Sequence, residues 1–186
     1  AGVIAAKNQR DWIEASVASL RAEVDELVVV DDGSTDGTAE LLGALSTRLE
    51  FTVIDGASGG VSNAYNLAID AVDSPVVLIQ GGDDIAVPGR GAASAKALED
   101  PSVVLVHSAP TVIDANGRIL PSDAAGEFGV SDPDDPVGYL FTVGNFICAP
   151  SVAVRRGDYV AHGGFPVGID LLQDYALWLE LASVGR

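Results

Sequence analysis

Short apolar runs alternate with segments of helical periodicity along the first half of the chain. The runs are rich in Val and Ile and apolar on both faces, and they occupy residues 3–6, 27–30, 51–54, 76–79 and 103–107. Such runs are typical of buried strands in a parallel sheet. Apolar side chains recur at helical spacing between them, in residues 11–22, 38–49 and 62–72. Because strand–helix–strand repeats form right-handed crossovers, we predict an α/β fold with a mostly parallel central sheet and helices on both faces.

The second half of the sequence is less regular. An Asn-Gly pair at its centre predicts that residues 111–120 form a hairpin. Residues 126–136 are rich in Asp and contain two Pro, which predicts a solvated loop. Alternation of apolar and polar residues predicts a half-buried strand over 151–155, and helical spacing predicts an amphipathic helix over 174–183.

Composition limits the possible partners. The chain of 186 residues has 27 acidic against 10 basic residues and a formal net charge of -17. Binding to nucleic acid or to an anionic membrane surface requires Lys and Arg, so we expect no nucleic-acid partner. A lone Cys148 excludes a disulfide framework. Apolar runs fall far short of the ~20 residues that span a bilayer. We therefore predict no transmembrane segment and a cytoplasmic protein, or one lying peripherally at the inner membrane face.

Acidic residues follow the predicted strands at the point where each strand ends. They are Asp31, Asp32, Asp55, Asp83 and Asp84. Successive parallel strands have their carboxyl ends at one edge of the sheet, where ligands of open α/β sheets bind. No Lys or Arg occurs between Arg48 and Arg90, so we expect nothing local to neutralise these carboxylates.

Carboxylates gathered without cations either take up protons or bind a metal ion. Their hard oxygen atoms favour Mg²⁺, Mn²⁺ or Ca²⁺, and such an ion often completes its shell with substrate phosphate. The alternative is that Asp is simply a frequent turn former and helix N-cap. We prefer that alternative for Asp36 and Asp55, but not for Asp83 and Asp84, which follow two glycines.

Five segments together resemble one enzyme family. Residues 28–38 (VVVDDGSTDGT) are similar to the nucleotide-binding segment of the GT-A family-2 glycosyltransferases. The other similar segments, in the same order as in the family, are residues 4–8 (IAAKN), 59–66 (GGVSNAYN), 79–88 (IQGGDDIAVP, like its Asp-x-Asp-Asp metal loop) and 151–178, with Gly-Gly-Phe and QDYALW. The chain departs from the family pattern at Gly81, Tyr65 and Gln173, where the family has Asp, Arg and Glu.

This resemblance implies a Rossmann-like GT-A fold and metal-dependent, inverting transfer of a sugar from a nucleoside-diphosphate sugar to an acceptor hydroxyl. It implies one domain over residues 1–186, with a nucleotide-binding half at about 1–90 and an acceptor half at about 91–186, cut short at its C-terminus. The implied cofactor is Mn²⁺ or Mg²⁺. The implied acceptor is a glycan, a lipid-linked molecule or a small molecule, in cell-surface polysaccharide biosynthesis.

The resemblance also implies roles for individual residues. Asp174 would be the general base, Asp84 would ligate the metal together with Asp83, and Asp32 would bind the nucleobase. The residues implied to bind the nucleotide-sugar are Ala5, Lys7, Asp31, Asp32, Gly33, Asn66 and Asp83. The implied acceptor loop consists of Gly163, Gly164 and Phe165.

Two other functions remain open. A sugar nucleotidyltransferase would share the ligand and a similar sheet. It would need a Gly-rich loop with Lys or Arg after the first strand, whereas residues 5–10 (AAKNQR) contain no Gly. A non-catalytic module that binds a nucleotide-sugar or a cation would retain the acidic edge but would not need Asp174.

Overall fold

The computed structural model describes residues 1–121, 133–169 and 171–185. Its strands are β1 (Gly2–Ala6), β2 (Leu27–Asp31), β3 (Thr52–Asp55), β4 (Val76–Gly81), β5 (Leu105–Val106) and β6 (Ala153–Arg155). Its helices are α1 (Ile13–Arg21), α2 (Thr38–Leu49), α3 (Val61–Asp70), α4 (Arg90–Ala97), α6 (Pro136–Thr142), the 3₁₀ helix η1 (Ala149–Ser151), α7 (Arg156–Ala161) and α8 (Gln173–Ala182). Among these, no helix has the length and apolar character needed to cross a membrane.

One central sheet has the strand order β3-β2-β1-β4-β6-β5. Strands β3, β2, β1 and β4 are parallel to one another, whereas β6 is antiparallel to β4 and to β5. The predicted mostly parallel α/β fold is therefore confirmed. The strand β1 lies at the centre of the parallel part, because it pairs with β2 on one side and with β4 on the other.

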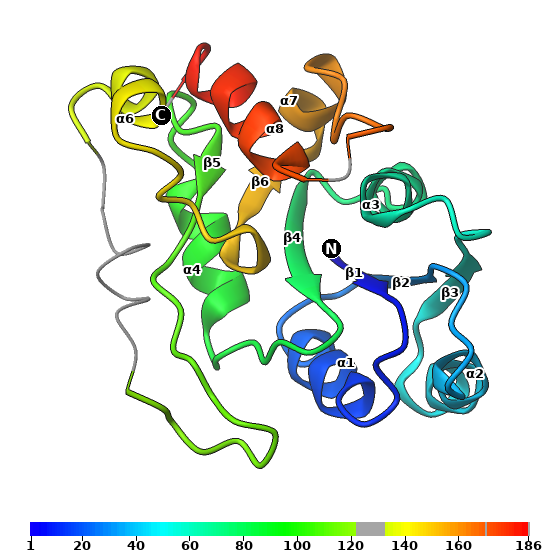
Figure 1. Cartoon of the computed structure of the whole chain (residues 1–186). Coiled ribbons are helices and arrows are strands. Elements are labelled where there is room, and N and C mark those ends of the chain that lie inside the picture. The colour runs from blue at the N-terminus through cyan, green and yellow to red at the C-terminus, as the bar shows by residue number, and fades with distance from the viewer. Residues whose placement is uncertain (122–132, 170, 186) are drawn as a thin grey trace.

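Helices cover both faces of the sheet, as expected from the crossovers. In Figure 1, α1 and α2 lie on one side of strands β1–β3 and α3 lies on the other. Successive side chains of β1 pack on opposite faces of the sheet. Val3 belongs to the core cluster that contains α3, and Ile4 belongs to the core cluster that contains α1 and α2. The final helix α8 belongs to the α3 layer through Leu177 and Trp178.

Two predicted strands are less buried than the sequence indicated. The run at 51–54 becomes β3, which is half-exposed because it has a neighbour on one side only. The run at 103–107 contributes only β5, a two-residue strand at the other edge that is antiparallel to β6. The prediction of a buried parallel strand there was wrong, since a short apolar run does not reveal which strand it pairs with. Conversely, β6 is more buried than predicted because it lies between β4 and β5.

The second half contains helices that periodicity did not indicate. A bridge between Ile113 and Ile119 confirms the hairpin around the Asn-Gly turn. Of the predicted loop at 126–136, residues 126–132 lie outside the described residues. Its last residue, Pro136, begins α6, and the side chain of Asp135 caps this helix by accepting from the Gly138 N–H at 2.9 Å. Helices α4, α6 and α7 are six to eight residues long, too short for an apolar stripe to establish a clear period.

We predict that shortening Ile4 destabilises the whole domain. Ile4 is 0 % exposed in the central strand, so Ile4→Ala leaves a cavity and should lower the free energy of unfolding by about 2–5 kcal/mol. The matched variant Ile119→Ala changes a side chain that is 74 % exposed and should stay within about 0.5 kcal/mol of the parent. Urea unfolding followed by circular dichroism measures both, and equal losses would contradict the assignment of β1 to the core.

Candidate functional site

The carboxyl ends of the four parallel strands lie side by side at one edge of the sheet. Ala6 of β1 pairs with Asp31 of β2, and Asp31 pairs with Asp55 of β3. On the other side of β1, Ala5 pairs with Gly81 of β4. The register therefore brings the loops that carry the predicted acids to a common edge, which we call the acidic edge.

Asp32 is buried at the acidic edge, and both of its carboxylate oxygens have partners. Its Oδ2 lies 3.2 Å from Nζ of Lys7, and the amide N–H of Gly60 donates to its Oδ1 at 3.0 Å. The Asp32 side chain is 5 % exposed, whereas that of Lys7 is 51 % exposed. A buried carboxylate held by a cation and a backbone amide keeps a defined position.

Asp31 and Gly33 shape the turn that follows β2. Oδ2 of Asp31 accepts from the N–H of Ser34 at 3.2 Å, while its Oδ1 is buried and has no hydrogen-bond partner among the described residues. Gly33 has φ of 77°, and a Cβ there would lie 2.0 Å from Oγ of Ser58. Both the left-handed backbone and the close approach require glycine, so this turn packs directly against the loop after β3.

Gln9 joins the loop after β1 to the turn after β4. Its Nε2 donates to Oδ1 of Asp83 at 3.1 Å. A Cβ on Gly82 would lie 1.9 Å from Oε1 of Gln9, so glycine at this position permits the contact. The loop that carries Lys7 thus touches Asp83 as well as Asp32.

Buried side chains support the turn that carries Asp83 and Asp84. Gln80 is fully buried, and its Nε2 donates to the carbonyl of Asp84 at 3.2 Å and to that of Ser16 in α1 at 3.1 Å. Oγ of Ser16 donates in turn to the carbonyl of Gly81 at 2.8 Å. Buried polar groups with their partners satisfied hold one conformation, so α1 fixes the shape of this turn.

Gly81 lies directly beneath both carboxylates of this turn. Its N–H donates to Oδ2 of Asp84 at 3.2 Å. A Cβ at position 81 would lie 2.5 Å from Oδ2 of Asp84 and 3.2 Å from Oδ1 of Asp83. The two acids fold back over the end of β4 and occupy the space that a third side chain would need.

Two cations reach the acidic edge, contrary to the expectation that nothing neutralises it. Lys7 pairs with Asp32, and Arg90 of α4 donates through Nη1 to Oε1 of Gln80 at 3.1 Å. Burial raises the pKa of Asp84, and Asp83 raises it further, whereas Arg90 lessens the increase. The expectation failed because these long side chains fold back onto the edge from outside the loops that carry the acids.

Asp174 lies in the first turn of α8, and its side chain contacts the half-buried Asn145. Nδ2 of Asn145 lies 3.5 Å from Oδ2 of Asp174. Burial raises the pKa of the Cys148 thiol, and the carboxylates of Asp84 and Asp174 both raise it further. Because a coulombic effect weakens with distance, both carboxylates belong to the surroundings of this thiol.

The predicted acceptor loop packs on Asn66. Nδ2 of Asn66 donates to the carbonyl of Phe165 at 2.8 Å, and the N–H of Phe165 donates to Oδ1 of Asn66 at 3.0 Å. Gly163 and Gly164 have φ of 82° and 66°, and a Cβ on Gly164 would lie 2.7 Å from Oδ1 of Asn66. Asn66 thus contacts the segment that leads to α8, and its assigned contact with the nucleotide-sugar stays a prediction.

Two other acids serve as turn formers. Oδ1 of Asp36 accepts from the N–H of Thr38 at 2.9 Å, and Oδ1 of Asp55 accepts from the N–H of Ala57 at 2.8 Å. The hydroxyl of Thr38 also donates to Asp36 and lowers its pKa. These contacts support the turn-forming explanation for both residues.

The strongest candidate metal ligands are the adjacent carboxylates of Asp83 and Asp84. Within the described ranges, no group of three or more His, Cys, Asp or Glu side chains is arranged to hold a metal ion. A hard cation held by one or two carboxylates takes its other ligands from water and substrate phosphate. The pair therefore fits an ion that is bound together with a diphosphate.

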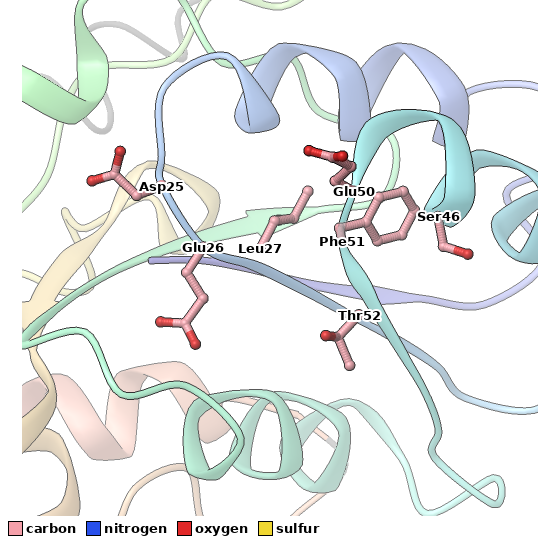
Figure 2. Close-up of a pocket in the computed structure, with 7 residues that line it drawn as sticks. All are labelled: Asp25, Glu26, Leu27, Ser46, Glu50, Phe51 and Thr52. Carbon is pink, nitrogen blue, oxygen red and sulfur yellow. The ribbon is translucent and has the colours of Figure 1, made fainter.

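A separate hollow of about 370 Å³ lies at the opposite ends of β2 and β3 (Figure 2). It is lined by Asp25, Glu26, Leu27, Ser46, Glu50, Phe51 and Thr52. Its lining follows the helices and precedes the strands, whereas ligands of parallel sheets bind where strands end. We therefore place the functional site at the acidic edge and not in this hollow.

Several polar residues at the acidic edge were not anticipated from the sequence, namely Gln9, Gln80, Arg90 and Asn145. A signal existed for Gln80, because an amide that ends an apolar strand must find buried partners. A signal also existed for Arg90, because it is the first basic residue after Asp83 and Asp84 in the sequence. No pattern marks Gln9 or Asn145, since their contacts come from distant parts of the chain.

Comparisons with known proteins identify the family of this chain. A sequence model of the family described as "Glycosyl transferase family 2" matches residues 3–159. The UDP-Glc:alpha-D-GlcNAc-diphosphoundecaprenol beta-1,3-glucosyltransferase WfaP of Escherichia coli is 27 % identical over 188 residues, covering 98 % of this chain and 70 % of that protein. The succinoglycan biosynthesis protein ExoU of Rhizobium meliloti is 39 % identical over 93 residues, covering 47 % of this chain and 27 % of that protein.

Solved structures share the fold. S. aureus TarS has a TM-score of 0.71 and 20 % identity, covering 98 % of this chain and 55 % of that one. The mannosyltransferase PcManGT of Pyrobaculum calidifontis, in complex with GDP-Man and Mn²⁺, has a TM-score of 0.68 and 22 % identity, covering 90 % of this chain and 47 % of that one. The chain thus spans about half the length of these structures, and at this identity they establish its fold.

We predict that Asp84→Asn stabilises the protein at pH 7 when no divalent metal ion is present. Because burial and Asp83 raise the pKa of Asp84, ionisation of this carboxyl opposes folding. That destabilisation is absent below the ordinary pKa of Asp and develops as the pH rises through the raised value. The urea midpoint of the variant should exceed that of the parent at pH 7, and the gain should shrink as the pH falls.

The control for this measurement is Asp55→Asn, which changes an exposed turn-forming carboxylate and should give no such gain. A lower urea midpoint for Asp84→Asn at pH 7 would show that the carboxylate is well compensated in the folded protein.

Proposed function

Because the chain belongs to glycosyl transferase family 2, we propose that it catalyses metal-dependent, inverting transfer of a sugar from a nucleoside-diphosphate sugar to an acceptor hydroxyl. The observation that carries the proposal is that Asp84 and Asp174, from distant parts of the chain, both lie near enough to Cys148 to raise the pKa of its thiol. The first residue is a candidate metal ligand and the second a candidate base. Transfer needs both groups close to one anomeric carbon, so their common neighbourhood favours an enzyme over a binding module.

In the proposed donor site, Asp32 binds the nucleobase. Support comes from its fixed position between Lys7 and the Gly60 amide, at the carboxyl end of β2. The backbone around Ala5 and Lys7 lines the same pocket, and the turn at Asp31 and Gly33 forms its floor. Neighbouring structures are described in complex with UDP-GlcNAc and with GDP-Man, which supports a nucleoside-diphosphate sugar as the class of donor.

In the proposed metal site, Asp84 ligates Mn²⁺ or Mg²⁺ and Asp83 contacts the ribose or shares the ion. Support comes from their hard oxygen atoms and from the burial, followed by repulsion from Asp83, that raises the pKa of Asp84. When bound, such an ion offsets the charge that develops on the leaving diphosphate. Gln80 and Ser16 keep the turn in the conformation that presents both carboxylates.

In the proposed transfer step, Asp174 takes the proton of the acceptor hydroxyl as its oxygen attacks the anomeric carbon. A carbon–oxygen bond forms to the acceptor, and the bond to the nucleoside diphosphate breaks with its electron pair. A single displacement inverts the configuration at that carbon. Asn145 lies close enough to hold the Asp174 carboxylate in orientation.

The acceptor is proposed to bind beside the loop of Gly163, Gly164 and Phe165, in the half at about 91–186, while the donor binds the half at about 1–90. A glycan, a lipid-linked molecule or a small molecule fits a base that activates a hydroxyl. WfaP is named for a diphosphoundecaprenol-linked acceptor and ExoU for succinoglycan biosynthesis, which supports a role in cell-surface polysaccharide synthesis. Action in the cytoplasm, or peripherally at the inner membrane face, stays a prediction.

We predict that Asp174→Asn abolishes transfer but leaves nucleotide binding intact. The amide keeps the size of the side chain and cannot accept the proton, so kcat should fall by about 10²–10⁴-fold. The Kd for the nucleoside diphosphate with Mn²⁺, measured by calorimetry, should not change. Glu180→Gln, an exposed change on the same helix, is the matched control and should retain full activity. Equal turnover of Asp174→Asn and the parent would refute the assignment of the base.

We predict that Asp84→Ala removes the Mn²⁺-dependent part of nucleoside-diphosphate binding. Calorimetry with UDP, GDP and dTDP, each with and without Mn²⁺, identifies the nucleotide in the parent and measures the loss in the variant. Glu50→Ala, which removes a carboxylate from the hollow in Figure 2, should leave metal dependence unchanged. Retained metal dependence in Asp84→Ala, or its loss in Glu50→Ala, would overturn the proposed metal site.

A further inference from the structure

Helix α3 contacts both the end of β4, which leads into the Asp83–Asp84 turn, and Phe165, which precedes the helix of Asp174. Adjacent residues of α3, Tyr65 and Asn66, make these contacts. The hydroxyl of Tyr65 donates to the carbonyl of Gln80 at 3.0 Å, at the last residues of β4. Asn66 pairs with the backbone of Phe165, which lies far along the chain in the acceptor half.

The side-chain amide of Asn66 pairs with the backbone of Phe165 through two hydrogen bonds, one donated and one accepted. Its amide donates to the Phe165 carbonyl at 2.8 Å and accepts from the Phe165 N–H at 3.0 Å. The hydroxyl of Tyr159 donates to the same Oδ1 at 2.5 Å and also accepts from the Phe165 N–H at 3.1 Å. Phe165 and Tyr159 are 2 % and 3 % exposed. Loss of the amide would remove the donor to the buried Phe165 carbonyl and leave the Phe165 N–H with Tyr159 alone, which is costly.

The ring of Phe165 connects this hydrogen-bonded group to α8 by direct packing. It packs against the ring of Trp178 with centroids 5.8 Å apart, and Trp178 is 1 % exposed. Trp178 lies one helical turn beyond Asp174, so a shift of Phe165 moves the start of the helix that carries the carboxylate. The ring of Tyr65 also packs against that of Phe165, with centroids 5.4 Å apart.

We propose that Tyr65 and Asn66 are positioning residues that hold the Asp83–Asp84 turn and the Asp174 helix in a fixed relation. The inference rests on the proposed function, since it concerns the geometry of the same transfer step. It gives Asn66 a different role from the nucleotide-sugar contact assigned from the sequence, because both edges of its amide are engaged by Phe165 and Tyr159. It also assigns a role to Tyr65, whose hydroxyl contacts Gln80 and whose ring packs against Phe165.

The test compares turnover with nucleotide binding in two variants. Asn66→Leu keeps the branched shape of the side chain, though with bulkier ends, and removes all its polar contacts, whereas Tyr65→Phe removes only the hydroxyl that reaches Gln80. Misplacement of reacting groups should lower kcat by about 10-fold to 10²-fold, while KM for the donor and the calorimetric Kd for the nucleoside diphosphate stay unchanged. One matched control is Asp70→Leu, an exposed site one turn further along α3. The other is Tyr139→Phe in α6, where the Tyr139 ring packs against Phe146. Both should retain the parent kcat.

Fluorescence gives a readout that does not depend on activity. In a Trp12→Phe background, Trp178 is the sole Trp of the chain. Asn66→Leu should shift its emission to longer wavelength and increase quenching by acrylamide, because the packing against Phe165 loosens. Asp70→Leu should leave the spectrum unchanged.

Three results would overturn the inference. One is an unchanged kcat in both variants, and Tyr65→Phe alone decides this if Asn66→Leu does not fold. The second is a raised donor KM and nucleotide Kd with unchanged kcat, which would return Asn66 to the donor site. The third is an unchanged Trp178 spectrum in Asn66→Leu.

A parent without transfer activity would refute the proposed function, and the fluorescence result would then decide the positioning role by itself.

Discussion

The parallel pairing of β1 with both β2 and β4 is the constraint on which the rest of the structure depends. In this register Ala6 lies beside Asp31 and Ala5 beside Gly81, so three consecutive crossovers deliver their loops to one edge. A hairpin connection would have turned alternate loops to the opposite edge. The buried apolar strands therefore place the acids, which lie at or shortly after the last residue of β2, β3 and β4. The hollow at the other end of β2 and β3 illustrates the difference, since acids gather there without this convergence.

Gathering carboxylates at one edge has an energetic cost that the fold offsets only in part. Asp32 is compensated by Lys7 and by a backbone amide, whereas Asp84 keeps a raised pKa despite the nearby guanidinium of Arg90. The residual repulsion is unfavourable in the isolated protein and favours a cation that arrives with a diphosphate. The charge on Asp84 thus lowers the stability of the isolated protein while it favours the proposed binding of a cation, a trade-off that is common at functional sites.

The two halves of the chain meet through buried polar contacts as well as through the core. Asn66, Tyr159 and the backbone of Phe165 form a closed hydrogen-bonded group within the α3 layer, and Tyr65 extends it to the end of β4. Such a group is more directional than apolar packing, because each member has few acceptable geometries. The proposed positioning role of Tyr65 and Asn66, by which α3 acts on the orientation of α8, rests on this group. The group also explains the glycine at position 164, where a side chain would collide with Asn66.

The sequence by itself determined the fold class, because short β-branched runs alternating with helical segments can be buried only as a parallel sheet between helices. It also determined that Asp31, Asp32, Asp83 and Asp84 share an edge, since strand ends in such a sheet coincide. The partners of those acids, among them Gln9, Gln80, Arg90 and Asn145, were decided by the tertiary structure alone. The pairing of β5 and β6, and the use of Asn66 to hold Phe165, were decided in the same way. The physical reason is that periodicity records which face of an element is buried, whereas a hydrogen bond between distant residues depends on where whole elements pack.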